Sequence, residues 1–545
     1  MGLLALVEDR PTPKEVYNWR VYACAAVASF ASCMIGYDSA FIGTTLALPS
    51  FVDEFGWNKM SSSHLATVKA NIVSVYQAGA FFGAFFAFAS NHFCGRKISL
   101  YIYSVVFCLG AGMMLGANAH RGLGLIYAGR VLAGIGVGGA SMVVPIYISE
   151  LSPPAVRGRL VGVYELGWQI GGLVGFWINY GISETLAPSH SQWLIPFAVQ
   201  LIPGGLLLIG TTWLRESPRW LLTQNKREKA IKNLCWIRQL PADHIYIVEE
   251  VSFIDAAIEE QSKAIGTGFW KPFLAVKRSR SLQWRLILGC LLFMWQNGSG
   301  INAINYYSPT VFKSLGIKGT NNGFFTTGLF GVVKTALTIV WLLVLIDRLG
   351  RRKLLMIGSI GGSLCMWYVG AYIKIAGTDS SSNPNASLTG AGVSAIFFFY
   401  LWTAFYTPSW NGTPWVLNSE MFPTSTRALG QASASASNWF WNFIISRFTP
   451  QMFLTMSYGV YFFFASLMIL SVPFVYFLVP ETKGVPLEAM DRLFQVHPVR
   501  KAHKIVMEEL IREEESFRHD AEGAGLEIAK EHLKAAHVEK VVAQV

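Results

Sequence analysis

The chain has 545 residues, of which 52% are hydrophobic and only 14% are charged, and its formal net charge is +11. Runs of about 20 apolar residues recur along it, and each is long enough to cross a bilayer. Such a composition excludes an ordinary soluble enzyme domain. The basic residues lie mainly in short loops and near the termini, so the positive charge indicates membrane topology rather than nucleic-acid binding.

Twelve candidate spans predict an all-α membrane protein with twelve transmembrane helices. In chain order they begin near Val21, Ala70, Ile98, Leu123, Leu160, Trp193, Leu286, Phe324, Leu354, Val393, Leu429 and Gly459. No cleavable signal peptide precedes the first span, because residues 1–20 are polar. The first span itself is therefore expected to direct insertion.

Basic residues recur in alternate loops, at Arg96–Lys97, Arg157–Arg159 and 348–353. The loops at 182–191 and 376–392, which fall on the opposite side, contain no Lys or Arg. By the positive-inside rule, both termini and the polar segment 215–284 are expected to face the cytoplasm. A glycosylation sequon begins at Asn385, in a predicted outer loop.

The two halves of the sequence resemble each other. Residues 93–99 resemble 348–354, 148–158 resemble 418–428, and 215–221 resemble 480–488. The offsets between matching residues are nearly constant: 255 from Gly95 to Gly350, 270 from Glu150 to Glu420 and 265 from Glu216 to Glu481. This pattern predicts two pseudo-symmetric six-helix halves, an arrangement that transporters use with a substrate site between the halves.

Five segments follow from these boundaries. They are a cytoplasmic N-terminus at 1–20, a six-helix bundle at 21–214, linker helices at 215–284, a second bundle at 285–479 and a cytoplasmic tail at 480–545. The linker contains two helical patterns, at 223–240 and 244–265. In the tail, residues 487–494 are expected to be helical and the last forty residues to be loose.

Four motifs now point to a family. They are the paired G-R-[RK] loops, the S-E-x-x-P-x-x-x-R pattern at 149–157 and 419–427, E-S-P-R-W-L at 216–221 and P-E-T-K-G at 480–484. In this order, and over about residues 17–495, the chain resembles the sugar porter family of the major facilitator superfamily. Within that family it resembles the quinate permeases of filamentous fungi, on residues 8–50, 164–181 and 295–314.

This resemblance implies proton-coupled uptake of quinate, a polyhydroxy cyclohexane carboxylate, across the plasma membrane by alternating access. The alternatives are a hexose or pentose symporter of the same fold, or a nutrient sensor that binds without transporting. An enzyme is not expected, because the sequence contains no nucleophile–base set or metal-ligand cluster. The partners expected are the small-molecule substrate, protons and the lipid bilayer, with no cofactor, no metal and no nucleic acid, and with the monomer as the functional unit.

The segment WQNGSGINAINYYSP at 295–309 is unusually polar for a membrane span. On one regular helix, four of its residues fall within an arc of about 120°: Ser299, Asn302, Asn305 and Tyr306. Gln296 lies about 60° beyond this arc, and Asn297 lies well away from it. Amides match hydroxyl groups because both donate and accept hydrogen bonds, which favours a polyol site. The alternative is hydrogen bonding between helices.

By resemblance, Gln296 and Asn302 contact the substrate, and Asn305 and Ser299 face the same cavity. Trp415 is expected to stack on the substrate ring or to close beneath it, and Asn438 to reach the substrate. Trp439 beside it could equally be a packing residue.

Ionisable residues inside spans are functional candidates. The resemblance makes Asp38 the proton carrier and places Arg130 beside it; the alternative is a permanent structural ion pair. Glu165 and Lys334 replace amides of typical sugar porters. They could form a buried ion pair. Alternatively, Lys334 could hold a substrate carboxylate while Glu165 accepts hydroxyl groups.

A further set of charges is expected at the cytoplasmic helix ends. Glu150, with Arg157 and Arg159, repeats in the second half as Glu420 and Arg427, with a Glu-to-Arg spacing of seven in both halves. The resemblance makes these residues a latch between the halves. Asp347 and Arg351 of the second G-R-R loop join this gating group. The alternative is topogenic charge with helix capping.

Overall fold

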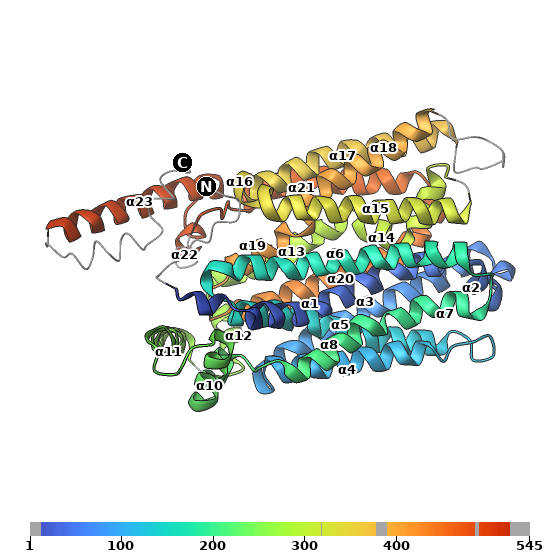
Figure 1. Ribbon diagram of the computed structural model, residues 1–545. Coiled ribbons are helices and arrows are strands. Elements are labelled where there is room, and N and C mark those ends of the chain that lie inside the picture. Colours follow the sequence, from blue (N-terminus) through green and yellow to red (C-terminus); the bar gives the residue numbers. More distant parts are fainter. Residues whose placement is uncertain are drawn as a thin grey trace.

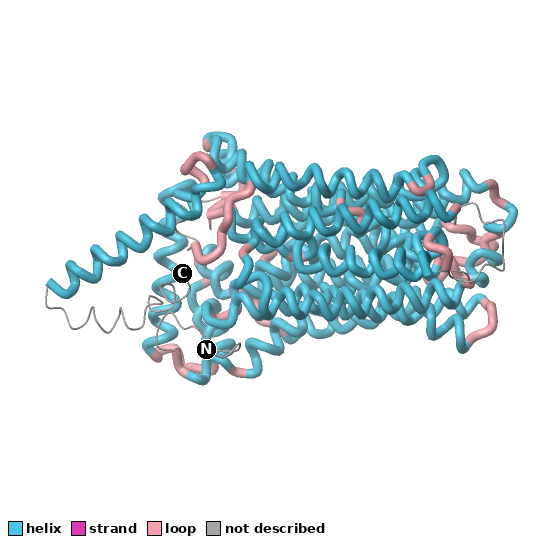
Figure 2. Tube along the Cα trace, turned by 90° about the horizontal axis from the view of Figure 1, so that it is seen from above, coloured by secondary structure: helices cyan, strands magenta, loops and turns pink. Residues whose placement is uncertain are grey.

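The computed structural model describes residues 12–266, 268–317, 319–377, 390–423, 425–485 and 490–523. These residues form helices and no β-strand (Figures 1 and 2). Most of the helices run lengthwise in one bundle, with α10, α11, α22 and α23 gathered at one end and α2 at the other (Figure 1). We call the end with α10 and α11 the linker side and the opposite end the far side.

The first half of the bundle contains six spans. They are α1 (Trp19–Thr45), α3 (Ser62–Phe93), α4 (Arg96–Met114), α5 (Gly124–Leu151), α6 (Pro154–Thr185) and the pair α7 (His190–Val199) and α8 (Leu201–Trp213). Short helices precede and connect the first two spans: η1 (Lys14–Tyr17), α2 (Pro49–Glu54) and η2 (Trp57–Lys59). All six spans expected from the sequence in this half are therefore present.

The second half also contains six spans. They are α13 (Arg280–Gly298) with α14 (Ile301–Ser314), α15 (Thr320–Val340) with η3 (Trp341–Leu345) and α16 (Ile346–Leu349), α17 (Arg351–Ala376), α18 (Gly390–Tyr406) with η4 (Thr407–Asn411) and α19 (Thr413–Met421), α20 (Arg427–Met456) and α21 (Gly459–Leu478). Three of these spans are interrupted. Both η3 and η4 are π-helical turns, which are frequent at functional sites.

Between the halves lie α9 (Pro218–Thr223), α10 (Arg227–Arg238), α11 (Ile245–Ile265) and α12 (Lys271–Arg278), and after the last span lie α22 (Met490–Leu493) and α23 (Val499–Gly523). The two linker helices expected from the sequence correspond to α10 and α11. The prediction that the last forty residues are loose is wrong for 506–523, because α23 continues through them. The sequon at Asn385 lies outside the described residues.

Within the described residues, nine helices are long and apolar enough to cross a membrane by composition alone. The three spans missing from that set are α6, α13 with α14, and α20. Each carries several polar side chains at depth, and together they contribute most of the site described below.

The two halves meet along four helix pairs: α1 with α14, α3 with α20, α5 with α20, and α6 with α15. On the α1–α14 pair the backbones approach so closely that a Cβ atom on Gly43 would collide with the carbonyl oxygen of Tyr306. Farther out, Ser183 donates a hydrogen bond to Asn321 across the α6–α15 pair. The halves are therefore in direct contact toward the far side.

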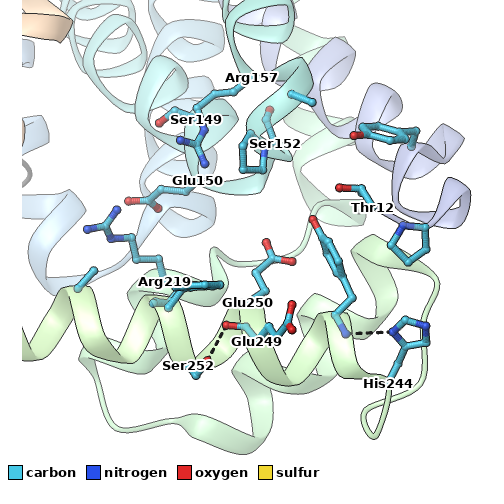
Figure 3. A pocket seen from close by; sticks show the side chains of 18 of the residues that line it. Thr12, Ser149, Glu150, Ser152, Arg157, Arg219, His244, Glu249, Glu250 and Ser252 are labelled. Carbon is cyan, nitrogen blue, oxygen red and sulfur yellow. Dashed lines mark hydrogen bonds between the residues drawn. The ribbon is translucent and has the colours of Figure 1, made fainter. Parts of the chain in front are cut away.

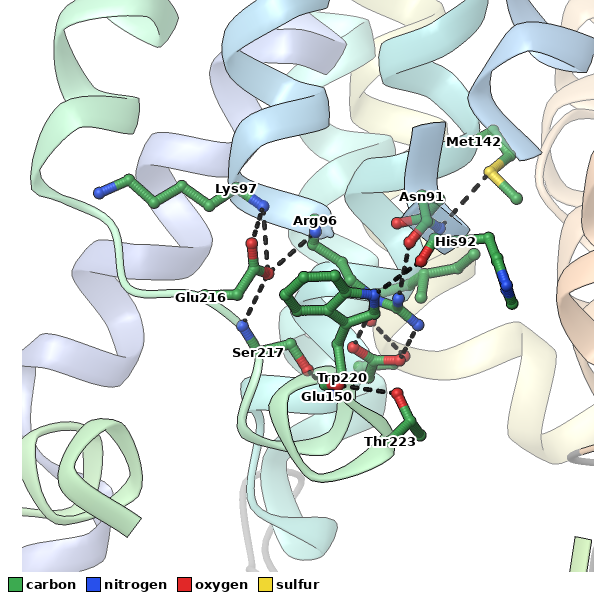
Figure 4. A network of polar contacts seen from close by, with 12 residues as sticks. Asn91, His92, Arg96, Lys97, Met142, Glu150, Glu216, Ser217, Trp220 and Thr223 are labelled. Atoms are coloured by element: carbon green, nitrogen blue, oxygen red, sulfur yellow. Dashed lines mark hydrogen bonds and ion pairs between the residues drawn. The ribbon is translucent and has the colours of Figure 1, made fainter. Parts of the chain in front are cut away.

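The duplication seen in the sequence has a direct counterpart in the geometry. Gly95 (φ 89°) and Gly350 (φ 82°) occupy equivalent positions before α4 and α17. Glu216 accepts hydrogen bonds from the backbone N–H groups of Arg96 (2.9 Å) and Lys97 (3.1 and 3.2 Å) (Figure 4). The Glu216 carboxylate therefore caps the N-terminus of α4, where the first backbone N–H groups have no partner within the helix.

The second half repeats this cap. Glu481 accepts from the N–H groups of Arg351 (2.9 Å) and Arg352 (3.0 Å). At both positions only glycine fits, because a Cβ on Gly95 or Gly350 would press on the capping carboxylate. Burial raises the pKa of Glu216 above its ordinary value, although four hydrogen bonds from backbone N–H groups act against that rise.

Replacing Glu216 with Ala should leave the first N–H groups of α4 without an acceptor. We expect a loss of about 1–3 kcal/mol in the free energy of unfolding, measured by thermal denaturation in detergent. Glu216→Gln is the matched control, because its amide oxygen still accepts the hydrogen bonds. Glu481→Ala should reproduce the effect in the other half. Equal damage from Gln and Ala would mean that the charge, and not the cap, provides the stability.

Candidate functional site

The polar segment 295–309 does not form one regular helix. α13 ends at Gly298, Gly300 adopts a left-handed conformation (φ 88°), and α14 begins at Ile301. Ser299 bridges the break: its Oγ donates to the carbonyl of Gln296 (2.6 Å) and accepts from the N–H of Ile301 (3.4 Å). Ser299, predicted to face the cavity, is 1% exposed and caps the break instead.

The break brings together residues that a regular helix would separate. Asn302 donates a hydrogen bond to Oδ1 of Asn297. Asn297 in turn donates to Oδ1 of Asn438 on α20 (3.2 Å). The prediction that Asn297 lies away from the other amides is therefore wrong, because the periodicity assumed an unbroken helix. Asn302 and Asn438 were both expected to contact the substrate, and the hydrogen bonds through Asn297 bring these two side chains near each other.

Gln296 links α13 by hydrogen bonds to the tenth span, which consists of α18, η4 and α19. Its Nε2 donates to the carbonyl oxygens of Trp410 (2.8 Å) and Asn411 (2.7 Å). These carbonyls are available because η4 is wound as a π-turn. The Oε1 atom of Gln296 makes no hydrogen bond within the described part of the chain, so one acceptor remains for a solute.

Glu165 on α6 joins the two halves. One of its oxygens accepts hydrogen bonds from Asn411 of the second half (2.7 Å) and from Gln169, one turn along α6 (2.9 Å). Lys334 on α15 interacts with Glu165 electrostatically. No ion pair joins them among those formed by the described residues, and Glu165 is held by amides instead. A closed Glu165–Lys334 salt bridge is therefore absent from that part of the structure.

Lys334 is buried, with 6% of its surface exposed, and its ammonium group makes no hydrogen bond to a described residue. It lines a void of about 10 Å³, room for a single water molecule, at the seam with Gln169 and Trp168 of α6 and Asn305 of α14. The Oδ1 atom of Asn305 is buried and has no hydrogen-bond partner among the described residues. A buried cation and an unsatisfied amide oxygen thus face one narrow void, which a solute larger than water does not fit unless the two halves separate.

The two tryptophans of interest differ in their surroundings. Trp415 on α19 is half-buried, with its ring 4.6 Å from that of Phe293. Trp439 on α20 is fully buried, stacks on Trp168 at 6.4 Å and donates to Ser141 (3.2 Å). Trp439 therefore packs between the halves, whereas Trp415 keeps an accessible face.

Asp38 and Arg130 form an ion pair, and both side chains are completely buried. Arg130 also donates to the carbonyl of Ile72 on α3 (3.2 Å) and lies over the ring of Tyr76, 4.3 Å from its centroid. The pair links α1 and α5 within the first half. A buried ion pair costs desolvation energy, so its presence at this depth calls for a functional explanation.

A family model described as "Sugar (and other) transporter" matches residues 24–494. The chain belongs to this family. It is 68% identical to a protein of Neosartorya fischeri called "Probable quinate permease", over 96% of both chains, and 70% identical to one of Neurospora terricola called "Quinate permease", over 94% of this chain and 95% of that one.

Among solved structures, the chain resembles the proton:xylose symporter XylE bound to 6-bromo-6-deoxy-D-glucose, with a TM-score of 0.71 and 27% identity over 87% of this chain and 99% of that one. It also resembles a partially occluded inward open conformation of the Escherichia coli xylose transporter XylE, with a TM-score of 0.70 and 26% identity over 86% and 100%. The fold is that of the major facilitator superfamily, with twelve spans in two six-helix halves.

The charges predicted as a latch lie at the linker side, next to two cavities. The larger, of about 860 Å³, is lined by Glu150, Arg157 and Arg427 among others (Figure 3). Glu150 forms a bidentate pair with Arg96 of its own half, at 2.8 and 2.9 Å. Arg219 and Arg427 border both cavities, so cations of both halves and of the linker surround this opening.

The second half repeats the same pairing, since Glu420 bonds to Arg351 (2.9 Å) and Thr482 (2.6 Å). Both predicted latch carboxylates thus have a partner within their own half. Arg159 is exposed on α6, and the side chain of Asp347 is outside the described residues. The latch between halves stays a prediction.

Three residues of the site were not anticipated as such. Asn411 and Gln169 hold Glu165, and Asn297 connects two predicted amides. A signal for Gln169 was available, because it follows Glu165 by four residues on a helix. No comparable sequence signal pointed to Asn411, since its position depends on the π-turn η4.

Replacing Gly300 with Ala should disturb the break, because its φ is positive and the added Cβ would lie 2.8 Å from the ring of Phe464. We expect a loss of about 1–3 kcal/mol in unfolding free energy, measured by thermal denaturation in detergent. Gly298→Ala is the matched control. Gly298 is helical, and the atom nearest to its added Cβ is 3.5 Å away, on Leu467. Equal stability of the two variants would contradict this account of the break.

Proposed function

We propose that the protein is a proton symporter for quinate, a ring polyol with one carboxylate. The observation that carries this proposal is Lys334, a buried cation that makes no hydrogen bond to a described residue and borders the same narrow void as Oδ1 of Asn305; the void would widen as the halves separate. Glu165 acts on Lys334 only electrostatically and is itself hydrogen-bonded to Asn411 and Gln169; a neutral sugar would add no paired anion, whereas a carboxylate would pair with Lys334 directly. The permease names of relatives 68–70% identical support the same substrate.

In this proposal the solute lies between α6 and the broken helices of the second half. The carboxylate pairs with Lys334, while the ring hydroxyls bond to Asn305, Asn302 and the free oxygen of Gln296. Glu165 accepts a hydrogen bond from one ring hydroxyl on its second carboxylate oxygen, because Asn411 and Gln169 both donate to the first. Trp415 offers its exposed face to the ring carbons.

Proton coupling is assigned to Asp38 and Arg130. Protonation of Asp38 would remove its attraction to Arg130 and free α1 to move. Five residues along α1, Gly43 packs on the backbone of Tyr306 in α14, so a shift of α1 would reach the helix that carries Asn302 and Asn305. One proton and one monoanion have zero net charge, and such a cycle draws on the pH gradient.

The remaining assignments follow from charge distribution. We place the linker side in the cytoplasm and the far side outside the plasma membrane, because the basic loops lie on the linker side. Glu150, Arg157, Arg159, Glu420, Arg427, Asp347 and Arg351 would then form the cytoplasmic gate. The monomer would be the transporting unit, since every proposed contact lies within one chain.

Asp38→Asn should abolish pH-driven accumulation of radiolabelled quinate in proteoliposomes, by about tenfold or more. Exchange of labelled for unlabelled quinate should persist, because the site itself is untouched. Asp53→Asn, an exposed aspartate on α2, is the matched control and should leave both activities unchanged. Accumulation by the Asp38 variant at the normal level would remove this residue from the proton pathway.

Lys334→Asn should raise the KM for quinate by about tenfold, since a charge-assisted pair is lost. Inhibition of quinate uptake by a neutral cyclitol such as myo-inositol should change much less. Lys374→Asn, a lysine at the far end of α17, controls for the loss of one positive charge. An equal loss for quinate and the neutral competitor would make Lys334 a structural residue and favour a sugar or polyol as the substrate.

A further inference from the structure

Helix α12, the last helix of the linker, carries large apolar side chains on an exposed face. Trp270, directly before the helix, is 69% exposed, and Phe273 and Leu274 are exposed as well. At 100° per residue, these three side chains fall within one arc of about 100°. Along the bundle axis, α12 lies nearer to the spans than α10 and α11 do (Figure 1). A contiguous apolar face at this depth calls for a surface that covers it.

The exposed face of α12 continues onto the outer surface of α3. Phe269 stacks on Phe93 with their ring centroids 5.3 Å apart, and Phe273 packs edge-on against Phe88, also at 5.3 Å. Phe93 is itself 65% exposed. Three further exposed phenylalanines lie nearer the middle of α3, which are Phe82, Phe85 and Phe86. A bilayer that covers this side of α3 therefore meets α12 at its edge.

The charge around this apolar face has one sign. Between Glu260 and Asp347 the sequence contains no Asp or Glu. Four exposed cations lie on or beside α12 and form no ion pair with a described carboxylate: Lys271, Lys277, Arg278 and Arg280. Lysine and arginine beside exposed tryptophan, phenylalanine and leucine are typical of a helix that lies on a membrane with anionic lipids.

We propose that α12 lies in the membrane–water interface and binds anionic lipid headgroups. Trp270, Phe273 and Leu274 enter the boundary of the acyl chains, a depth that tryptophan favours. The basic side chains extend from there to the headgroups, as long cationic side chains do at interfaces. Because no carboxylate lies among these cations in the sequence, the face is complementary to a negatively charged lipid surface.

The location of α12 connects this lipid contact to transport. Phe273 packs on α3 of the first half, and Ser279 alone separates α12 from α13 of the second half. α13 carries Gln296, one of the residues proposed to bind the solute. Lipid bound to α12 therefore restrains a segment that touches both halves.

Deuterium exchange of the reconstituted full-length protein tests this assignment, with a peptide covering residues 268–280 as the readout. Exchange should be about threefold slower in phosphatidylcholine vesicles with about 20% phosphatidylserine than in phosphatidylcholine alone. NaCl at about 500 mM should reduce this difference, because salt screens the headgroup charge. Inorganic phosphate at about 10 mM, added to phosphatidylcholine vesicles, should leave exchange unchanged, because a soluble anion does not cover the apolar face.

A triple variant of α12 that combines Lys271→Gln, Lys277→Gln and Arg278→Gln should lose the response to phosphatidylserine. Its matched control removes three exposed lysines at α10, Lys226→Gln, Lys229→Gln and Lys232→Gln, and should respond as the wild type. Trp270→Ser should raise exchange of the peptide in both lipids, because it weakens contact with the acyl chains.

Equal exchange of the wild type in both lipids, or a full lipid response in the α12 variant, would overturn the proposal. So would loss of the response in the α10 control, since net charge alone would then explain it. A decrease with phosphate would assign the cations to a soluble anion, and a decrease that grows with the protein-to-lipid ratio would assign the face to a second copy of the chain; both contradict the lipid site. If the α12 variant unfolds, exchange rises along the whole chain, and Trp270→Ser and the wild-type responses decide.

Discussion

A polar side chain inside a membrane-spanning helix must find a partner or water, because hydrocarbon offers neither donor nor acceptor. Nine helices of the described chain are apolar enough to meet most of this constraint by composition, and the buried Asp38 and Arg130 that two of them carry pair with each other. The remaining three spans, α6, α13 with α14, and α20, meet it through hydrogen bonds from their polar side chains to neighbouring segments. Glu165 and Gln296 both bond to η4 of the tenth span, and Asn438 accepts a hydrogen bond from Asn297 of α13, so the least apolar helices are held by hydrogen bonds to other spans.

The same constraint explains why some groups in the site remain incomplete. Gln296 uses its two donor hydrogens on carbonyls that η4 exposes, but its oxygen is left over. Asn305 and Lys334 have polar atoms with no described partner. A site whose internal bonds were all satisfied would have little to offer a solute. The protein pairs enough of these groups to hold the helices and leaves a few facing the cavity.

The sequence was sufficient for the fold and only partly sufficient for the site. Runs of apolar residues and the repeated motifs placed twelve spans and two halves correctly, since both signals depend on local composition. The side-chain pairings depended on the break at Gly300 and the π-turn before Gly412, where the regular 100° rotation no longer holds. The Asp38–Arg130 contact was anticipated from the family pattern, whereas the partners of Glu165 required coordinates.

The repeated caps at Glu216 and Glu481 have a mechanical consequence. Each fastens the end of the sixth span of a half to the start of the third span of that same half, and the Glu150–Arg96 and Glu420–Arg351 pairs do likewise for neighbouring helices. None of these bonds crosses the seam. Each bundle can therefore tilt as a rigid unit without breaking these hydrogen bonds and ion pairs. The contacts that change during reorientation are then those of the helix pairs between the two bundles.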